Sequence, residues 1–242
     1  MENYTILFLI VLALVAFMYA SVGHGGASGY LVFMALANIA PPQMKAAALV
    51  MNIAVSSISF FAYYRAGHFK LKLFLPFAIG SVPMAFIGGQ MLLSDQLYKQ
   101  LLALCLFIAT IRMLVKTKPG QEVKPMPVAA GVLCGGVIGL LSGMLGIGGG
   151  VLLSPLILIM HWAGVKQTAA TSALFILLNS ISGLVGFISK GNISFPPYFE
   201  WMLPIVVISG MLGAYYGSKK FEQQTLKQLL AIGLLIACYK LL

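Results

Sequence analysis

The hydrophobic pattern divides the chain into ten apolar segments, separated by short polar, glycine-rich or proline-containing breaks. The segments cover residues 4–22, 27–40, 46–64, 71–93, 97–115, 127–145, 150–162, 168–189, 199–218 and 225–241. A helix needs about 20 apolar residues to cross a bilayer, so most of these segments are long enough to be membrane spans. The pattern therefore predicts an all-α, multi-pass membrane protein. The second and seventh segments are too short to cross comfortably.

The two short segments occupy the same place in each half of the chain, and each follows a glycine cluster. These clusters are residues 23–26 (GHGG) and residues 146–150 (GIGGG). Short segments next to glycine breaks, at matching positions of two halves, are the best sequence indication of a transporter binding site. We predict a first transmembrane repeat at residues 1–115, a polar cytoplasmic linker at 116–126 and a second repeat at 127–242.

The composition excludes several classes of soluble protein. Hydrophobic residues make up 60% of the 242 residues, and there are 26 glycines in addition. Charged residues make up only 8%, against about 25% in a soluble domain. So few charges cannot cover a water-facing surface, which excludes a soluble enzyme, a disordered chain and a nucleic-acid-binding domain.

The formal net charge of +10 carries information about orientation. If all ten segments cross the membrane, eleven of the fifteen Lys and Arg residues fall on one side. The positive-inside rule makes that side cytoplasmic, so we expect a cell-membrane protein with both termini outside. Five crossings per half is an odd number, so the two repeats should be inverted relative to each other, as in many alternating-access transporters.

The glycine clusters are the first candidate binding site. Glycine-rich turns that lead into helix starts expose backbone N–H groups at the positive end of the helix dipole, which favours anions. Tight packing is the alternative explanation for both clusters. The substrate-binding candidates in them are Gly23, His24, Gly25, Gly26, Gly146, Gly148, Gly149 and Gly150.

A separate glycine stripe has a simpler interpretation. Gly131, Gly135, Gly139 and Gly143 recur every four residues along the sixth segment. A stripe of small residues lets a neighbouring helix approach closely, so we interpret this stripe as a packing surface.

The second cluster and its surroundings resemble a known family. Residues 139–155 (GLLSGMLGIGGGVLLSP), followed by Ala170, Thr171 and Ser172, are similar to the second-repeat signature of the sulfite exporter TauE/SafE family. Residues 23–26 stand where the first-repeat counterpart belongs, although His24 interrupts the glycines and Ala46, Ala47 and Ala48 stand where a Thr-Ser pair is expected. The resemblance implies a secondary transporter, and favours an exporter, of small anions such as sulfite, organosulfonates or related organic acids. It also makes the hydroxyls of Thr171 and Ser172 candidate substrate ligands.

Four further polar or charged side chains are candidates, and each of them, like His24, has two interpretations. Asn52 and Asn179 lie inside apolar helices, where they either bond across helices or line the substrate path. Lys45 and Lys166 stand at the starts of long helices, where they either snorkel to the interface or attract the anion and take part in gating. His24 could donate to an anion or change charge near neutral pH, or it could sit in a packed loop.

The distribution of acids and histidines favours an anion as substrate. The five carboxylates all lie at or near segment ends: Glu2, Asp95, Glu122, Glu200 and Glu222. Proton relays and cation sites usually place a carboxylate within the membrane. The three histidines are scattered, so the sequence predicts no metal site, and it predicts no cofactor either.

Two alternative functions stay open from the sequence, an anion channel and a divalent-metal transporter. An intramembrane protease is disfavoured, because Ser142-Gly143 offers only half of a serine-protease pattern and no histidine follows His161. A P-loop of the form GxxxxGK[ST] is absent from the sequence. The expected partners are a small anionic substrate and the lipid bilayer, without nucleic acid, and a homodimer stays open as an assembly.

Overall fold

A computed structural model describes residues 2–114, 123–191 and 193–219 of the chain. These residues form nine α-helices and no β-strand, which confirms the predicted all-α class. The helices are α1 (Glu2–Ser21), α2 (Ala27–Leu36), α3 (Pro41–Arg65), α4 (Leu71–Gln90), α5 (Asp95–Leu114), α6 (Val128–Leu145), α7 (Gly150–Ile159), α8 (Val165–Ile188) and α9 (Phe199–Lys219). The predicted tenth segment and most of the predicted linker lie outside the described residues.

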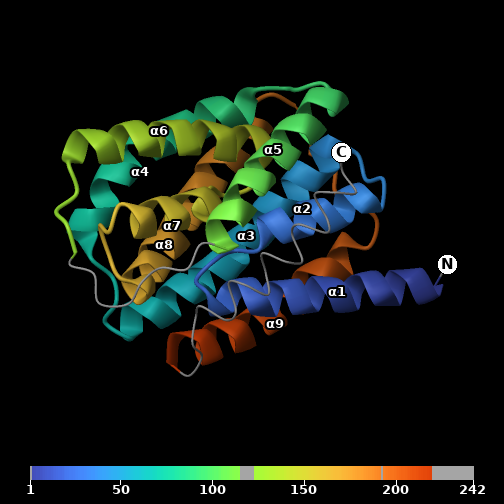
Figure 1. Cartoon of the computed structure of the whole chain (residues 1–242). Coiled ribbons are helices and arrows are strands. Elements are labelled where there is room, and N and C mark those ends of the chain that lie inside the picture. The colour runs from blue at the N-terminus through green and yellow to red at the C-terminus, as the bar shows by residue number, and fades with distance from the viewer. Residues whose placement is uncertain (1, 115–122, 192, 220–242) are drawn as a thin grey trace.

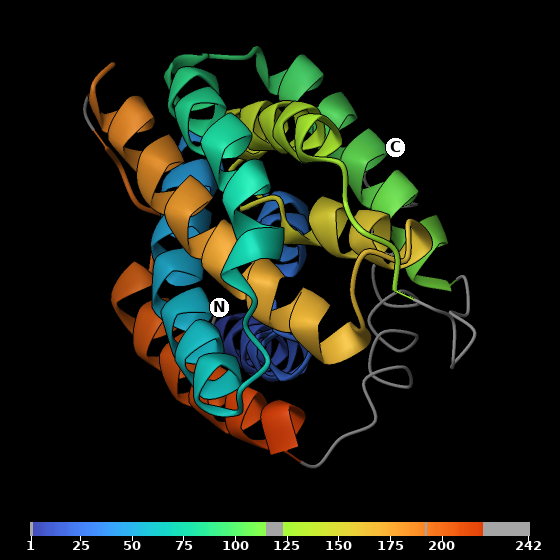
Figure 2. The same cartoon turned by 90° about the vertical axis from the view of Figure 1, so that its left-hand side faces the viewer.

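The helices form a bundle around two long central helices, α3 and α8, which pack against each other. α4 and α6 run side by side on one flank of this pair, and α1 and α9 run side by side on the other (Figures 1 and 2). α4 also packs on α8, and α9 packs on α3. Among the residues that the structure describes, five helices are long and apolar enough to cross a membrane: α3, α4, α6, α8 and α9.

Glycines allow both flanking pairs to approach at backbone distance. A methyl group at Gly139 of α6 would overlap the backbone of Ser81 on α4. Likewise, a methyl group at Gly213 of α9 would overlap the carbonyl of Phe17 on α1. The stripe predicted on the sixth segment is therefore a packing surface, because small residues are needed wherever two membrane helices meet this closely.

The helix contacts of the two halves match when α1, α2, α3 and α4 are paired in order with α6, α7, α8 and α9. The α4–α6 contact corresponds to the α9–α1 contact, and the α2–α3 contact corresponds to the α7–α8 contact. The central contact between α3 and α8 joins one matched pair, so it is the same contact in both halves. Two related repeats would produce this correspondence, and their inverted orientation stays a prediction.

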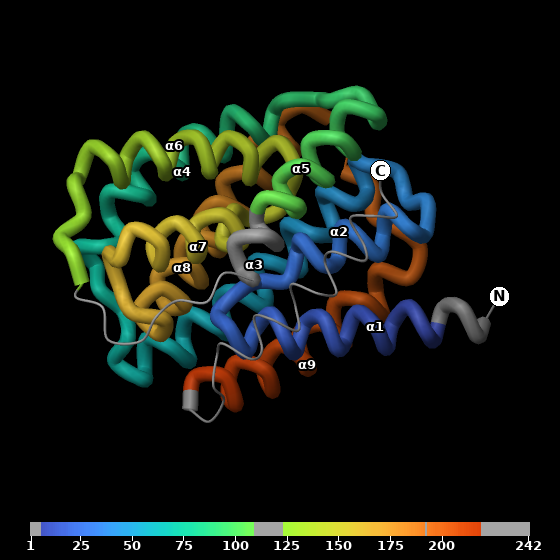
Figure 3. The backbone as a smooth tube through the Cα atoms, viewed as in Figure 1, coloured from blue at the N-terminus to red at the C-terminus, as the bar shows by residue number. Residues whose placement is uncertain are grey.

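The two short helices lie inside the bundle, with α2 and α7 toward opposite ends of it (Figure 3). Each has 10 residues, and 10 residues rise about 15 Å, half of the roughly 30 Å hydrocarbon core. Each also begins at a glycine in the left-handed conformation, Gly26 with φ of 93° and Gly149 with φ of 77°. An L-residue is disfavoured at such a φ, which explains the glycines at these two helix starts.

Candidate functional site

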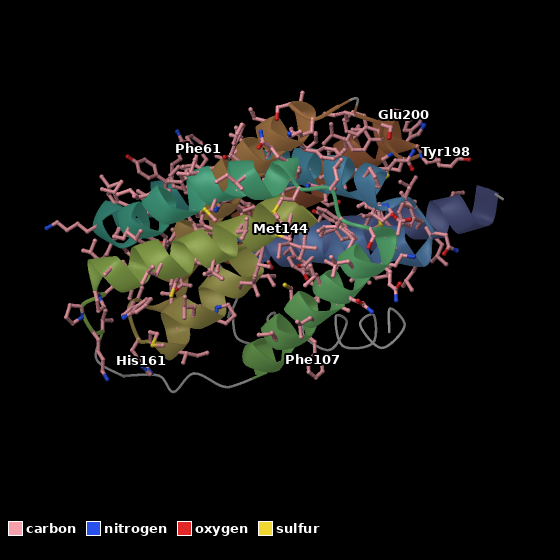
Figure 4. All side chains as sticks on the ribbon, turned by 90° about the horizontal axis from the view of Figure 1, so that it is seen from above. Phe61, Phe107, Met144, His161, Tyr198 and Glu200 are labelled. Carbon is pink, nitrogen blue, oxygen red and sulfur yellow. The ribbon has the colours of Figure 1, made fainter. Side chains whose placement is uncertain are left out.

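The two glycine loops, far apart in the sequence, meet on the side chain of Asn52 in α3. A methyl group at Gly25 of the first loop would overlap Asn52 Oδ1. A methyl group at Gly148 of the second loop would lie 2.6 Å from Asn52 Nδ2. The starts of α2 and α7 therefore converge on one side chain in the middle of the bundle. Met144, just before the second loop, lies near the middle of the molecule in Figure 4.

Asn52 caps the first of these helices from a distance. Its Oδ1 accepts a hydrogen bond of 3.1 Å from the backbone N–H of Ala27, the first residue of α2. The helix has no cap of its own, because the residue before it is Gly26. A side-chain oxygen at this place satisfies one of the N–H groups that a helix start leaves without a partner.

The other half of the Asn52 amide is buried without a hydrogen-bond partner. Asn52 is 1% exposed, and its Nδ2 has none among the described residues. The hydroxyl of Ser180 on α8 is also buried and unpartnered, and it lies 3.2 Å from the position a methyl group would take at Gly148. A buried polar group left unsatisfied costs about 1–3 kcal/mol, so two of them beside one glycine indicate a place for a polar ligand.

His24 connects the first loop to α7. Its Nδ1 lies 3.1 Å from the carbonyl oxygen of Val22, and its Nε2 lies 3.1 Å from that of Gly150. Nε2 also lies 3.1 Å from the Ser154 hydroxyl, which lies 2.7 Å from the Ser172 hydroxyl of α8. Ser172 thus reaches the loops through Ser154, and the whole chain of polar groups is buried.

Two predicted residues of α8 are buried, but their contacts do not tie them directly to the loops. Asn179 donates from Nδ2 to the carbonyl oxygen of Phe175 in its own helix, 2.9 Å away, and its Oδ1 is unpartnered. The hydroxyl of Thr171 is also buried and unpartnered. Against Gly148 the structure places Ser180, the neighbour of Asn179.

Ser154 and Ser180 lie beside the glycine loops but are not among the candidates predicted from the sequence. A serine in an apolar helix is common enough as a packing residue that its type carries no signal. The one available clue was position, because Ser154 lies on the short helix and Ser180 follows a buried asparagine.

The two lysines predicted to play matching roles lie in different environments. Lys45 is 3% exposed, and its Nζ donates a 3.0 Å hydrogen bond to the carbonyl oxygen of Gly89 near the end of α4. Its side chain also lies beside Gly146 at the start of the second loop. Lys166 is exposed and lies near His68. Burial, and then the positive charge of Lys166, lower the pKa of His68.

The charges near the loops are compatible with an anion. Lys45 is the only buried Lys, Arg, Asp or Glu in the part of the chain whose side chains are described. Over the same part, no three His, Cys, Asp or Glu side chains are grouped closely enough to hold a metal ion. His161 lies at the edge of the molecule, at the end opposite to Tyr198 and Glu200 (Figure 4).

A groove beside the second half of α3 is a cavity separate from the glycine loops. It lies between α3 and α9, has a volume of about 740 Å³, and includes Phe61, Arg65 and Tyr215 in its lining. The guanidinium of Arg65 lies 4.6 Å from the centre of the Phe61 ring. The Arg65 guanidinium in this groove is therefore a second positive group that could bind an anion, away from the glycine loops.

Comparison with known proteins gives a family profile and several relatives. The profile of a family described as Sulfite exporter TauE/SafE matches residues 7–241. The probable membrane transporter protein y4hK of Sinorhizobium fredii is 36% identical over 251 residues, covering 100% of both chains. The probable membrane transporter protein YdhB of Bacillus subtilis is 25% identical over 223 residues, covering 88% of this chain and 89% of the relative. No solved structure matches the chain significantly.

Proposed function

The chain belongs to the sulfite exporter TauE/SafE family of membrane transporters, and from that premise we propose that it is a secondary transporter of small anions in the cell membrane. The proposed substrates are sulfite, organosulfonates or related organic acids, and the proposed direction is export. The observation that carries the proposal is the convergence of two glycine-led helix starts on the side chain of Asn52, whose amide nitrogen is buried and has no partner among the described residues.

A helix start is a natural anion site, because its free N–H groups and the helix dipole both favour negative charge. Here two such starts come together at Gly25 and Gly148, so their effects on one bound anion would add. Asn52 Nδ2 and the Ser180 hydroxyl supply donors beside them. A sulfite or sulfonate oxygen is an acceptor that these donors fit, and a bare metal cation is not.

We propose that this site opens alternately to the two sides of the membrane. The matching contacts of α4 with α6 and of α9 with α1 support two inverted repeats, residues 1–115 and 127–242, joined by the linker at 116–126. Each repeat contributes one short helix, α2 or α7, to the site. Rocking one repeat against the other would expose the site first to one side and then to the other.

The test is transport by the purified protein in liposomes. Radiolabelled sulfite, a short-chain sulfonate and a small carboxylate are offered separately, with flux measured against concentration and current measured in parallel. Saturable flux of at least one of these anions supports the carrier. An unsaturated ohmic current would instead establish a channel, and transport of a divalent cation without any anion would establish a metal transporter.

The substitution Asn52→Asp tests whether the proposed site around Asn52 is the one used in transport. The aspartate keeps an oxygen for the Ala27 N–H, so the cap of α2 remains, but it removes the Nδ2 donor and adds a negative charge. A hydrogen bond to a charged group contributes about 1.5–3 kcal/mol, so we expect anion transport to fall by about tenfold or more. The control is Ser57→Ala on the same helix, whose hydroxyl donates to the carbonyl oxygen of Ile53 in α3. Equal transport by both variants would overturn the proposed site.

A further inference from the structure

The groove between α3 and α9 has a charged end and an apolar floor. Arg65, the last residue of α3, lies at one end and is the only charged residue among the described residues that line the groove. Closer to the middle of the two helices, the lining includes the apolar side chains of Ile58 and Met211. A ligand that matches this lining has a negatively charged head and an apolar body.

Aromatic residues on α9 indicate where the groove lies relative to the membrane surfaces. α9 has 21 residues, which rise about 31 Å, close to the roughly 30 Å hydrocarbon core. Exposed aromatic side chains stand at both of its ends, Tyr198 and Trp201 at the start and Tyr215 and Tyr216 at the other end. Tyr and Trp are enriched at both membrane–water interfaces. Because Tyr215 and Arg65 line the same groove, the Arg65 end lies at a membrane surface and the apolar floor lies within the hydrocarbon region.

Positive charge collects at this end of the bundle. Three exposed lysines lie here, at the starts of α4 and α8: Lys70, Lys72 and Lys166. Asp95 and Glu200, the carboxylates whose side chains are described, lie at the starts of α5 and α9, toward the opposite end. The positive-inside rule predicts the basic end to be cytoplasmic. Basic pockets between membrane helices on that side are typical binding places for anionic lipid head groups.

The matching interface in the other half of the molecule is closed. α3 pairs with α8 and α9 pairs with α4, so the groove corresponds to the contact between α8 and α4. At the ends of those two helices, Gln90 Nε2 donates a 3.1 Å hydrogen bond to the Ser189 hydroxyl. The ends of α3 and α9 instead leave a volume of about 740 Å³ beside Arg65. Since one interface is bridged and the other is open, the groove is not a simple consequence of the repeat.

We propose that this groove binds an anionic phospholipid, with the lipid phosphate on the Arg65 guanidinium and an acyl chain along the apolar floor at Ile58 and Met211. A guanidinium presents N–H donors in a planar fork that fits a phosphate group. The Arg65 guanidinium lies 4.6 Å from the centre of the Phe61 ring, a cation–π contact that holds it at the wall of the groove. The volume of about 740 Å³ is within the range of ligand pockets, about 300–1,000 Å³.

The carboxylate on α9 is too distant to take the place of the lipid. Glu200 stands 15 residues before Tyr215, which is a rise of about 22 Å along α9. A phospholipid at Arg65 also lies between α3 of the first proposed repeat and α9 of the second, and none of the glycine-loop residues lines this groove. The inference therefore does not depend on which substrate the protein carries.

The first experiment measures lipid binding to the purified protein in detergent by native mass spectrometry. Phosphatidylglycerol and phosphatidylcholine with the same acyl chains are compared. We expect phosphatidylglycerol to bind about tenfold more tightly, and Arg65→Gln to lose this preference, because a hydrogen bond to a charged group contributes about that factor. The control is Lys166→Gln, which removes an exposed cation from the same end of the bundle and should keep the preference. An equal effect of both substitutions would overturn the site at Arg65.

A competition measurement distinguishes a phospholipid from a free anion. Inorganic phosphate and glycerol phosphate carry the charged group without acyl chains. We expect neither of them to displace phosphatidylglycerol from the wild type, because the apolar floor contributes to binding only when a chain occupies it. Displacement by inorganic phosphate at the concentration at which the lipid itself binds would show that Arg65 holds a free anion, and would overturn the proposal.

The third experiment locates the lipid and does not depend on a variant that folds. The wild type is placed in liposomes that contain phosphatidylglycerol with a photoreactive diazirine in its acyl chain, and the labelled peptides are identified after illumination. We expect label to concentrate at Ile58 and Met211. Leu133 and Val137 of α6 are the reference, because both are exposed but lie outside the groove. Equal labelling of the groove and of these α6 residues would overturn the proposal.

Discussion

Gly148→Ala probes the contact between the second glycine loop and α3. Gly148 has φ of +73°, a conformation that costs an L-residue about 1–2 kcal/mol. A methyl group there would also lie 2.6 Å from Asn52 Nδ2 and 2.8 Å from Ile176 Cγ2, so these neighbours must move. Overpacking of this kind costs about 1–3 kcal/mol, and the two effects together should destabilise the protein by roughly 2–5 kcal/mol.

The chain contains a matched control for the backbone strain. Gly67, in the connection between α3 and α4, has a similar φ of +76°, but a methyl group there would have nothing within 4 Å. Gly67→Ala should therefore cost only the backbone strain of about 1–2 kcal/mol. The difference between the two variants, about 1–3 kcal/mol, measures the crowding around Asn52.

The assay is thermal unfolding of the purified protein in detergent, with and without saturating sulfite. A ligand at 100 times its Kd stabilises the folded state by about 2.7 kcal/mol. Gly67→Ala should lower Tm and keep the full sulfite-dependent increase. Gly148→Ala should lower Tm further and lose the increase, because the added methyl group occupies the space beside Asn52. The same sulfite-dependent increase in both variants would refute the placement of the anion at Gly148.

Three further predictions concern other parts of the molecule. Gly139→Ala should lower the free energy of unfolding by more than about 1 kcal/mol because its methyl group meets the α4 backbone, whereas Gly136→Ala, with nothing closer than 3.7 Å, should be nearly neutral in the same denaturation assay. Lys45→Met should raise the KM for sulfite because it removes the buried cation beside the second loop, while Lys166→Met should leave KM unchanged; equal effects in flux assays would contradict this. Lys166→Met should also raise the pKa of His68, since it removes one of the two causes that lower it; an NMR titration in which that pKa stays the same would contradict the assignment.

Hydrophobic runs and their breaks predicted the helices well, because the thickness of the membrane fixes how long an apolar helix must be. The predicted bounds differ by three residues or more at the ends of α2, α4 and α7 and at the starts of α3 and α8. The third segment was predicted to begin at residue 46 and the eighth at 168, but α3 begins at Pro41 and α8 at Val165. Both helices include polar residues in their first turns, and proline at a first turn costs nothing because the N–H it lacks has no partner there.

The candidate site was predictable only in part. The glycine clusters could be found because consecutive glycines at a helix start are unfavourable without a reason, and the structure places both clusters against Asn52. The difference between Lys45 and Lys166 could not be predicted, since both stand near helix starts. Lys45 is buried because the end of α4, at Gly89, packs over it, and this is a tertiary contact.

The most direct test of the account is to locate a bound anion. A structure of the protein with 2-bromoethanesulfonate, in which bromine marks the ligand by anomalous scattering, would show where an organosulfonate binds. The account predicts the sulfonate group between the two glycine loops, within hydrogen-bond distance of Asn52 Nδ2 and next to Gly148. A sulfonate bound instead at Arg65 in the groove between α3 and α9, with the glycine loops unchanged, would contradict it.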